Sequence, residues 1–140
     1  MKNVLLILSL FFLAYSCNKA ETLPPNTYEI NGSAKGVYNG IRAYLKNVDD
    51  INKEIVIDTA IVMNEVFSFK GKVSNASMRV ITINGINGNV PFILEPGKID
   101  VEIYKDSIYF SKVGGSKNNE VFNLYKKEQR KQTIALNEIR

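Results

Sequence analysis

The chain has 140 residues, a formal net charge of +4 and 23% charged residues, with no histidine and a single cysteine, Cys17. These counts exclude Ser–His and Cys–His nucleophile systems, histidine metal sites, an internal disulfide and a CxxC redox pair. The charge excess is too small to predict a nucleic-acid partner, and no pattern predicts a cofactor, a metal site or a catalytic residue.

Residues 1–16 have the pattern of a signal peptide. Lys2 precedes an apolar segment from Val4 to Ala14, which is shorter than the about 18 to 20 residues that a membrane-spanning helix needs. The letters LAYSC resemble the lipobox of bacterial lipoproteins, although Ala14 stands where that motif usually has leucine. The resemblance implies cleavage before Cys17 and lipidation of its thiol. An ordinary secretory signal with the same cleavage position remains the alternative.

Residues 17–27 are predicted to form the lipidated cysteine and a polar tether, which Pro24 and Pro25 make partly extended. Because Asn18 rather than aspartate follows the cysteine, the lipoprotein resemblance implies the outer membrane, with the domain facing the periplasm. We therefore expect contact with a membrane through the lipid anchor. Another envelope protein is the partner that this location allows, and the oligomeric state stays open.

Short β-rich segments begin at residue 28 and recur at intervals of about ten residues, separated by Gly, Asn and Asp. The expected strands are 28–32, 41–47, 54–62, 66–73, 78–84, 89–94, 98–104 and 108–112. NGING at 84–88 and EPG at 95–97 are turn signals that favour antiparallel neighbours. We therefore expect a mainly β fold over residues 28–113, an antiparallel β-sandwich or flattened barrel of about eight strands.

A C-terminal α-helix is expected over residues 114–140, with Ser116 or Asn118 as its N-cap. Four apolar side chains are expected to dock its first turns on the sheet: Val121, Phe122, Leu124 and Tyr125. Residues 126–133 lack apolar side chains and are predicted to project into water. The helix turns apolar again at its end, which suggests a missing partner, at Ile134, Leu136 and Ile139.

One acidic segment has the spacing of the first ligands of a calcium loop, at Asp50, Asn52 and Glu54. Such a loop needs glycine and glutamate further on, where this chain has Ile55 and Ile61. We therefore interpret the segment as a polar turn between strands.

Three other polar or aromatic patterns are weighed against simpler interpretations. Asp100 and Glu102 share one face of a strand, and we interpret them as solvated residues rather than as a catalytic carboxylate pair. The basic segment KKEQRK at 126–131 is interpreted as a solvated helix face, with contact to anionic lipid headgroups as the alternative. Stacking surfaces for a glycan or peptide are a third hypothesis, based on Tyr38, Tyr44, Tyr104 and Tyr109.

The order of five segments resembles an uncharacterised β-rich domain of Gram-negative bacterial lipoproteins, which commonly precedes a thioredoxin-like thiol-disulfide oxidoreductase domain. The segments are YEINGSAKG, RAYLKN, VIDTAIVMNEVFSFKGKV, PFILEPGKIDVEI and GGSKNNEVFNLYKK, within residues 28–127. One departure is Asn64-Glu65, where the family usually has glycine before the FSFKG strand. Because asparagine tolerates positive φ, we expect Asn64 to preserve the turn.

The resemblance implies a non-catalytic accessory or interaction domain, because the redox CxxC of such proteins belongs to the domain that follows. Lipidation would also consume the thiol of Cys17. The alternative is that this chain is the N-terminal piece of a thiol-disulfide oxidoreductase whose catalytic domain is missing.

Overall fold

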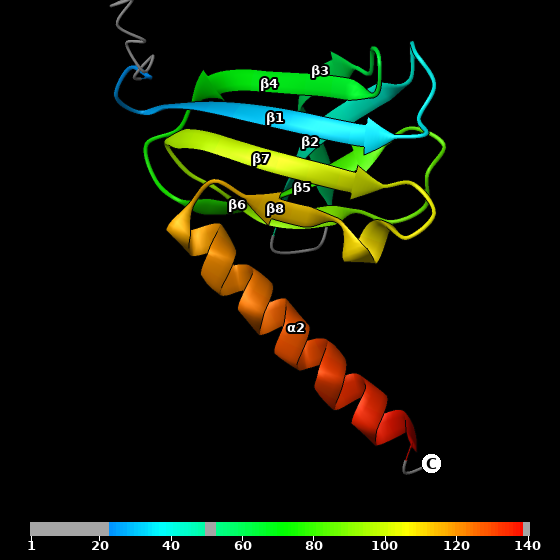
Figure 1. Cartoon of the computed structure of the whole chain (residues 1–140). Coiled ribbons are helices and arrows are strands. Elements are labelled where there is room, and N and C mark those ends of the chain that lie inside the picture. Colours follow the sequence, from blue (N-terminus) through cyan, green and yellow to red (C-terminus); the bar gives the residue numbers. More distant parts are fainter. Residues whose placement is uncertain (1–22, 50–52, 139–140) are drawn as a thin grey trace, which may run out of the picture.

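A computed structural model describes residues 23–49 and 53–138, which form two four-stranded sheets packed face to face and one long helix (Figure 1). The strands are β1 (Thr27–Lys35), β2 (Arg42–Val48), β3 (Glu54–Ile61), β4 (Val66–Lys72), β5 (Ser77–Ile83), β6 (Val90–Leu94), β7 (Gly97–Tyr104) and β8 (Lys112–Gly114). The sheet orders are β4-β1-β7-β8 and β3-β2-β5-β6. The mainly β prediction is therefore confirmed, as a sandwich and not a closed barrel. The predicted signal peptide and Cys17 lie outside the described residues.

One strand pair departs from the expected antiparallel arrangement. β1 and β7 run parallel, with Ile30 opposite Ile99. Parallel neighbours need a long connection, and here the chain between them contributes β4 and the whole second sheet instead of a crossover helix. Because β6 and β7 belong to different sheets, the turn at 95–97 carries the chain from one sheet to the other. NGING, by contrast, closes the β5–β6 hairpin as predicted.

The last expected strand, 108–112, is wrong in its first part. Residues Ile108–Phe110 form a short 3-10 helix, η2, and β8 begins at Lys112. The N–H of Ser107 donates to the carbonyl of Tyr104 over 3.0 Å, which turns the chain back before a strand can start. Ile108 is buried while its two successors are exposed, so this segment lacks the alternation that a strand in a sandwich requires.

The turn at Asn64-Glu65 joins β3 of one sheet to β4 of the other. Both residues have positive φ, 51° and 63°, as in the tight primed turns. The positive φ predicted for Asn64 is confirmed. The N–H of Asn64 donates to Oδ1 of Asn39 over 2.7 Å, and Oε1 of Glu65 accepts from the N–H of Gly36 over 2.8 Å. These two bonds hold the turn against the loop after β1.

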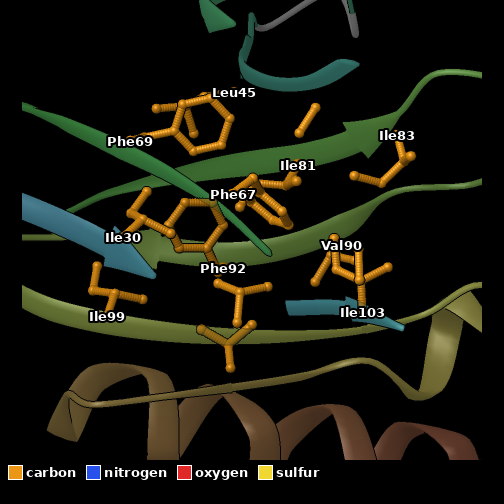
Figure 2. Close-up of a cluster of buried hydrophobic side chains, with 14 of the residues drawn as sticks. Ile30, Leu45, Phe67, Phe69, Ile81, Ile83, Val90, Phe92, Ile99 and Ile103 are labelled. Atoms are coloured by element: carbon orange, nitrogen blue, oxygen red, sulfur yellow. The ribbon is translucent and has the colours of Figure 1, made fainter. Parts of the chain in front are cut away.

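The core lies between the two sheets and is built from alternating inward side chains (Figure 2). Full burial of each large apolar side chain contributes about 1.5 to 3 kcal/mol. Phe67 and Phe69 pack edge to face, with ring centroids 5.6 Å apart. Residues of one sheet face those of the other, with Ile30, Phe69, Ile99 and Ile103 opposite Leu45, Ile81, Ile83 and Phe92.

The helix α2 (Lys117–Glu138) starts beside the sandwich and runs away from it (Figure 1). Ser116 is the N-cap, because its Oγ accepts the N–H of Asn119 over 3.3 Å. The side chain of Asn118 donates instead to Glu95 over 2.6 Å. Within residues 23–49 and 53–138, no helix is both long and apolar enough to cross a membrane.

Two asparagines attach α2 to the edge strands of both sheets. Asn119 is fully buried, and its amide accepts from the N–H of Ile93 and donates to the carbonyl of Ile93, each over 2.8 Å. One turn later, Nδ2 of Asn123 donates to the carbonyl of Val113 over 2.5 Å. The prediction that apolar side chains dock this segment is wrong for three of the four. More than half of each side chain is exposed at Val121, Leu124 and Tyr125.

Candidate functional site

The segment with calcium-loop spacing shows no ligand arrangement in its described part. Asp50 and Asn52 lie outside the described residues. The carboxylate of Glu54 pairs with the ammonium of Lys46 over 2.8 Å, and that hydrogen bond lowers the pKa of Glu54. In the described parts of the chain, no group of three or more Cys, Asp or Glu side chains is placed to hold a metal ion.

The carboxylates of Asp100 and Glu102 lie exposed on the outer face of β7, as predicted. Glu102 faces Lys112 of β8 at 3.7 Å. Both acids border a shallow depression that also contains Asn31 and Ser33. Exposed carboxylates on an open sheet face lack the enclosure that shields a catalytic acid from water.

The four tyrosines considered as stacking surfaces do not form one platform. Tyr44 lies on β2 and Tyr104 on β7, which belong to different sheets. Each carries a lysine over its ring, Lys46 at 5.8 Å and Lys112 at 5.5 Å. Tyr109 borders a cavity beside η2.

A cavity of about 320 Å³ lies between η2, the start of β6 and the middle of α2. Its lining is mainly apolar. The residues around it are Asn89, Val90, Pro91, Ile108, Tyr109, Ser111, Lys126 and Arg130. The size and the apolar lining with a few polar groups are typical of small-molecule sites. We call this cavity the basic pocket, because the charged side chains in its lining are two cations.

Lys126 and Arg130 enter the pocket from one face of α2, since residues four apart in a helix lie on the same side. The Nζ of Lys126 lies 3.4 Å from the carbonyl oxygen of Pro91 and 5.0 Å from the centroid of Phe122. Burial, and secondarily the charge of Arg130, lower the pKa of Lys126. Arg130 donates to the carbonyl of Tyr109 over 3.1 Å.

The interpretation of 126–131 as a solvated helix face is therefore wrong for Lys126, which is partly buried, whereas Arg130 is exposed although it borders the pocket. Lys127 and Lys131 are exposed, and Lys131 pairs with Glu128 at 2.8 Å. Sequence reasoning missed the pocket because a basic segment on a helix is usually solvated. The spacing of Lys126 and Arg130, one turn apart after the docked Asn123, was the signal that could have indicated it.

An apolar groove lies between the first turns of α2 and the outer face of β5 and β6. It has a volume of about 530 Å³. Phe122 and Tyr125 stack along it with centroids 6.3 Å apart. The apolar residues that line it are Ala76, Met78, Ile93, Val121, Phe122 and Tyr125. Met78, Val121 and Tyr125 leave half or more of their surface in water, which makes the groove a docking surface candidate.

Fold and surface together define a small β-sandwich domain with a projecting helix and two hollows beside it. Residues 28–122 match a family described as a domain of unknown function, DUF4369. This match covers more than half of the chain, so the protein belongs to that family. No curated protein and no solved structure matches the chain. The uncharacterised β-rich domain expected from the sequence is confirmed by this family and by the fold.

Proposed function

We propose that this protein is a lipid-anchored accessory protein of the bacterial cell envelope, whose β-sandwich binds another envelope protein rather than catalysing a reaction. The observation that carries the binding role is the apolar groove beside α2. Its exposed apolar side chains include Val121 and Tyr125 on the helix and Met78 on β5. Contiguous apolar surface in water is characteristic of interaction sites.

The anchor is supported by the N-terminal sequence alone, where an apolar segment leads directly to LAYSC and Cys17. One acyl chain gives only reversible membrane binding, whereas two or more hold a protein stably. Because the chain has no second cysteine, a thiol-linked lipid has one possible position.

Metabolic labelling with a fatty acid tests the anchor directly. The native protein should incorporate label and Cys17→Ala should not, because the acceptor thiol is gone. Ser9→Ala, a change inside the apolar segment that keeps the LAYSC motif, is the matched control and should label like the native protein. Equal labelling of the native protein and Cys17→Ala would overturn the anchor.

Site-specific photo-crosslinking in the native envelope tests the docking role. A photoreactive residue in place of Tyr125 should give a discrete protein adduct, and one in place of Tyr38, which is exposed on a loop after β1, should not. Adding Val121→Lys should remove the adduct, because a charge in the groove disfavours apolar docking. The absence of any adduct from position 125, or an equal adduct from position 38, would contradict the docking role.

A second candidate follows from the resemblance to domains that precede thioredoxin-like proteins: this domain is the N-terminal part of a thiol-disulfide oxidoreductase. The observation that favours it is the exposure of Ile134 and Leu136 far along α2, where a following domain could cover them. Reading the DNA beyond the codon for Arg140 tests this candidate. A continuing frame that encodes CxxC supports it, and a frame that ends without one opposes it.

A further inference from the structure

The ammonium of Lys126 is partly buried and has no acidic partner among the described residues. Its Nζ lies 3.4 Å from the carbonyl oxygen of Pro91 on β6 and 5.0 Å from the ring centroid of Phe122. None of the salt bridges among the described residues includes it. Moving a cation out of water is costly unless an anion or several hydrogen bonds replace the lost hydration.

A second cation borders the same cavity. Arg130 has five N–H donors and uses one on the carbonyl of Tyr109, while its guanidinium lies 5.3 Å from the ring of Phe110. Asn89, at the rim, hydrogen-bonds Glu54, but that carboxylate is already paired with Lys46 over 2.8 Å. The described residues therefore place two cations beside the cavity and leave both without a neutralising carboxylate.

The rest of the cavity is apolar. Val90, Pro91 and Ile108 line it, and Tyr109, which is mostly exposed, borders it. Pockets with this composition bind ligands whose body is apolar and whose orientation is fixed by a few polar contacts. A small inorganic anion would satisfy the cations but leave the apolar wall in contact with water.

From this juxtaposition we propose that the basic pocket binds a small amphiphilic carboxylate, with its carboxylate between Lys126 and Arg130 and its alkyl chain or ring against Val90, Pro91 and Ile108. This site goes beyond the docking role proposed above and shares no lining residue with the groove. The cavity of about 320 Å³ is near the lower end of ligand-site volumes and favours a body of medium-chain length.

Binding of radiolabelled octanoate to the full-length protein in lipid nanodiscs tests the proposal, with empty nanodiscs subtracted. Wild-type protein should bind octanoate saturably. Octanol, which lacks the charge, and acetate, which lacks the tail, should compete about tenfold or more weakly, since a charge-assisted contact contributes more than one tenfold step in affinity. Octyl phosphate, used as a competitor, distinguishes recognition of a phosphate from recognition of a carboxylate. We expect unlabelled octanoate to displace the radiolabelled octanoate at least as effectively as octyl phosphate does.

Matched variants identify the residues. Lys126→Gln and Arg130→Gln should each weaken octanoate binding about tenfold, while Lys126→Arg should restore it to within about threefold of wild type. Lys127→Gln, which removes the same charge from an exposed position one residue away, should bind like wild type. Circular dichroism and the thermal midpoint of each variant show that the fold is retained, and a comparable loss of binding in Lys127→Gln would indicate a general charge effect.

Competition and mutagenesis each have outcomes that would overturn the proposal. These outcomes are saturable binding that Lys126→Gln leaves unchanged in a folded protein, competition by octanol equal to that by octanoate, and tighter competition by octyl phosphate. The absence of saturable octanoate binding by the wild-type protein would overturn it as well. None of these outcomes touches the fatty-acid labelling or crosslinking experiments, so the site and the proposed function fail independently.

Discussion

At the scale of single residues, the side-chain amide of Asn119 takes the place of a neighbouring strand. Its carboxamide offers one acceptor and one donor to the outer edge of β6, and both are used on the backbone of Ile93. Without this amide, two backbone groups under the helix would lose their partners, and unsatisfied buried polar groups are costly. Asn119 is therefore a structural residue, although its position in a polar helical segment would predict a solvent-exposed one.

Asn119→Leu should lower the free energy of unfolding by about 1 to 3 kcal/mol, because the new side chain buries the edge of β6 without pairing it. Urea denaturation of both proteins measures this. The control is Asn118→Leu, since Asn118 is exposed and donates only to Glu95. Equal stability of the two variants would show that the contacts of Asn119 contribute nothing.

Gly32 is required because an aromatic ring occupies the place of its side chain. A Cβ on Gly32 would lie 2.1 Å from Cζ of Phe67, well inside contact distance. Gly32→Ala should therefore destabilise the protein by about 1 to 3 kcal/mol through overpacking. Gly114→Ala, at a strand position with open space around the new Cβ, should change stability by less than about 0.5 kcal/mol. Thermal or urea denaturation of the two variants measures these changes in the free energy of unfolding. Similar losses of stability in Gly32→Ala and Gly114→Ala would contradict the prediction.

At the scale of elements, the strands were predictable and the attachment of the helix was not. Alternation such as Ile99, Val101 and Ile103 depends only on the two-residue period of a strand, so the sequence displays it directly. The parallel pairing of β1 with β7 depends on which strands meet across distant parts of the chain, and no local pattern encodes that. The docking of α2 through two asparagines was missed for a related reason. Polar residues on a helix are predicted to be exposed to solvent unless the position of the neighbouring strand edge is known.

The candidate site was less accessible to sequence analysis than the fold. Lys126 and Arg130 were visible as part of a basic segment, but the apolar wall of the pocket comes from β6 and from η2, and η2 was expected to be part of a strand. A pocket made by three elements requires their relative placement, and only the helical spacing of the two cations could be predicted.

The lowered pKa of Lys126 predicts a pH dependence of stability. In an unfolded chain a lysine titrates near pH 10.4, so between the lowered pKa and that value the unfolded state binds more protons than the folded state. Stability contributed at this site therefore rises with pH and is lowest when Lys126 is charged. The difference in unfolding free energy between wild type and Lys126→Gln should increase from pH 7 to pH 10.

The same pH series on Lys127→Gln is the control, since Lys127 is exposed on the neighbouring helix position. Taking differences between variants cancels groups that titrate in all of them, such as Tyr28, whose pKa burial raises. A difference for Lys126→Gln that stays flat or falls with pH would contradict the burial of its ammonium.

At the scale of the whole molecule, the two lateral borders of the sandwich differ in whether their edge strands are covered. On one border α2 covers the edges of β6 and β8, and on the other β3 and β4 are edge strands (Figure 1). β3 is apolar and about half exposed at Ile55, Val56 and Ile57. Exposed apolar edge strands promote pairing between copies of a chain, although a bulge opposite Leu45 and Lys46 perturbs this one.

Ile57→Lys should reduce self-association of the concentrated protein, because a lysine on an edge strand opposes strand pairing. Ile57 is the extra residue of the bulge, without a partner in register on β2, so the change should cost less than about 0.5 kcal/mol. Light scattering against concentration measures self-association, with Ile55→Val as the control that keeps the edge apolar. Unchanged scattering from Ile57→Lys would show that this edge does not drive association.

The side-chain amides of Asn119 and Asn123 attach the first turns of α2 to the sandwich, and the rest of the helix extends away from these contacts. Hydrogen bonds from Lys126 and Arg130 continue this attachment, so eight residues of the helix extend beyond its last contact with the sandwich. At 1.5 Å per residue these span about 12 Å, and a tilt of about 10° at Arg130 displaces the tip by about 2 Å. Because Asn119 and Asn123 bind one strand of each sheet, the direction of α2 is fixed by the relative position of the two sheets.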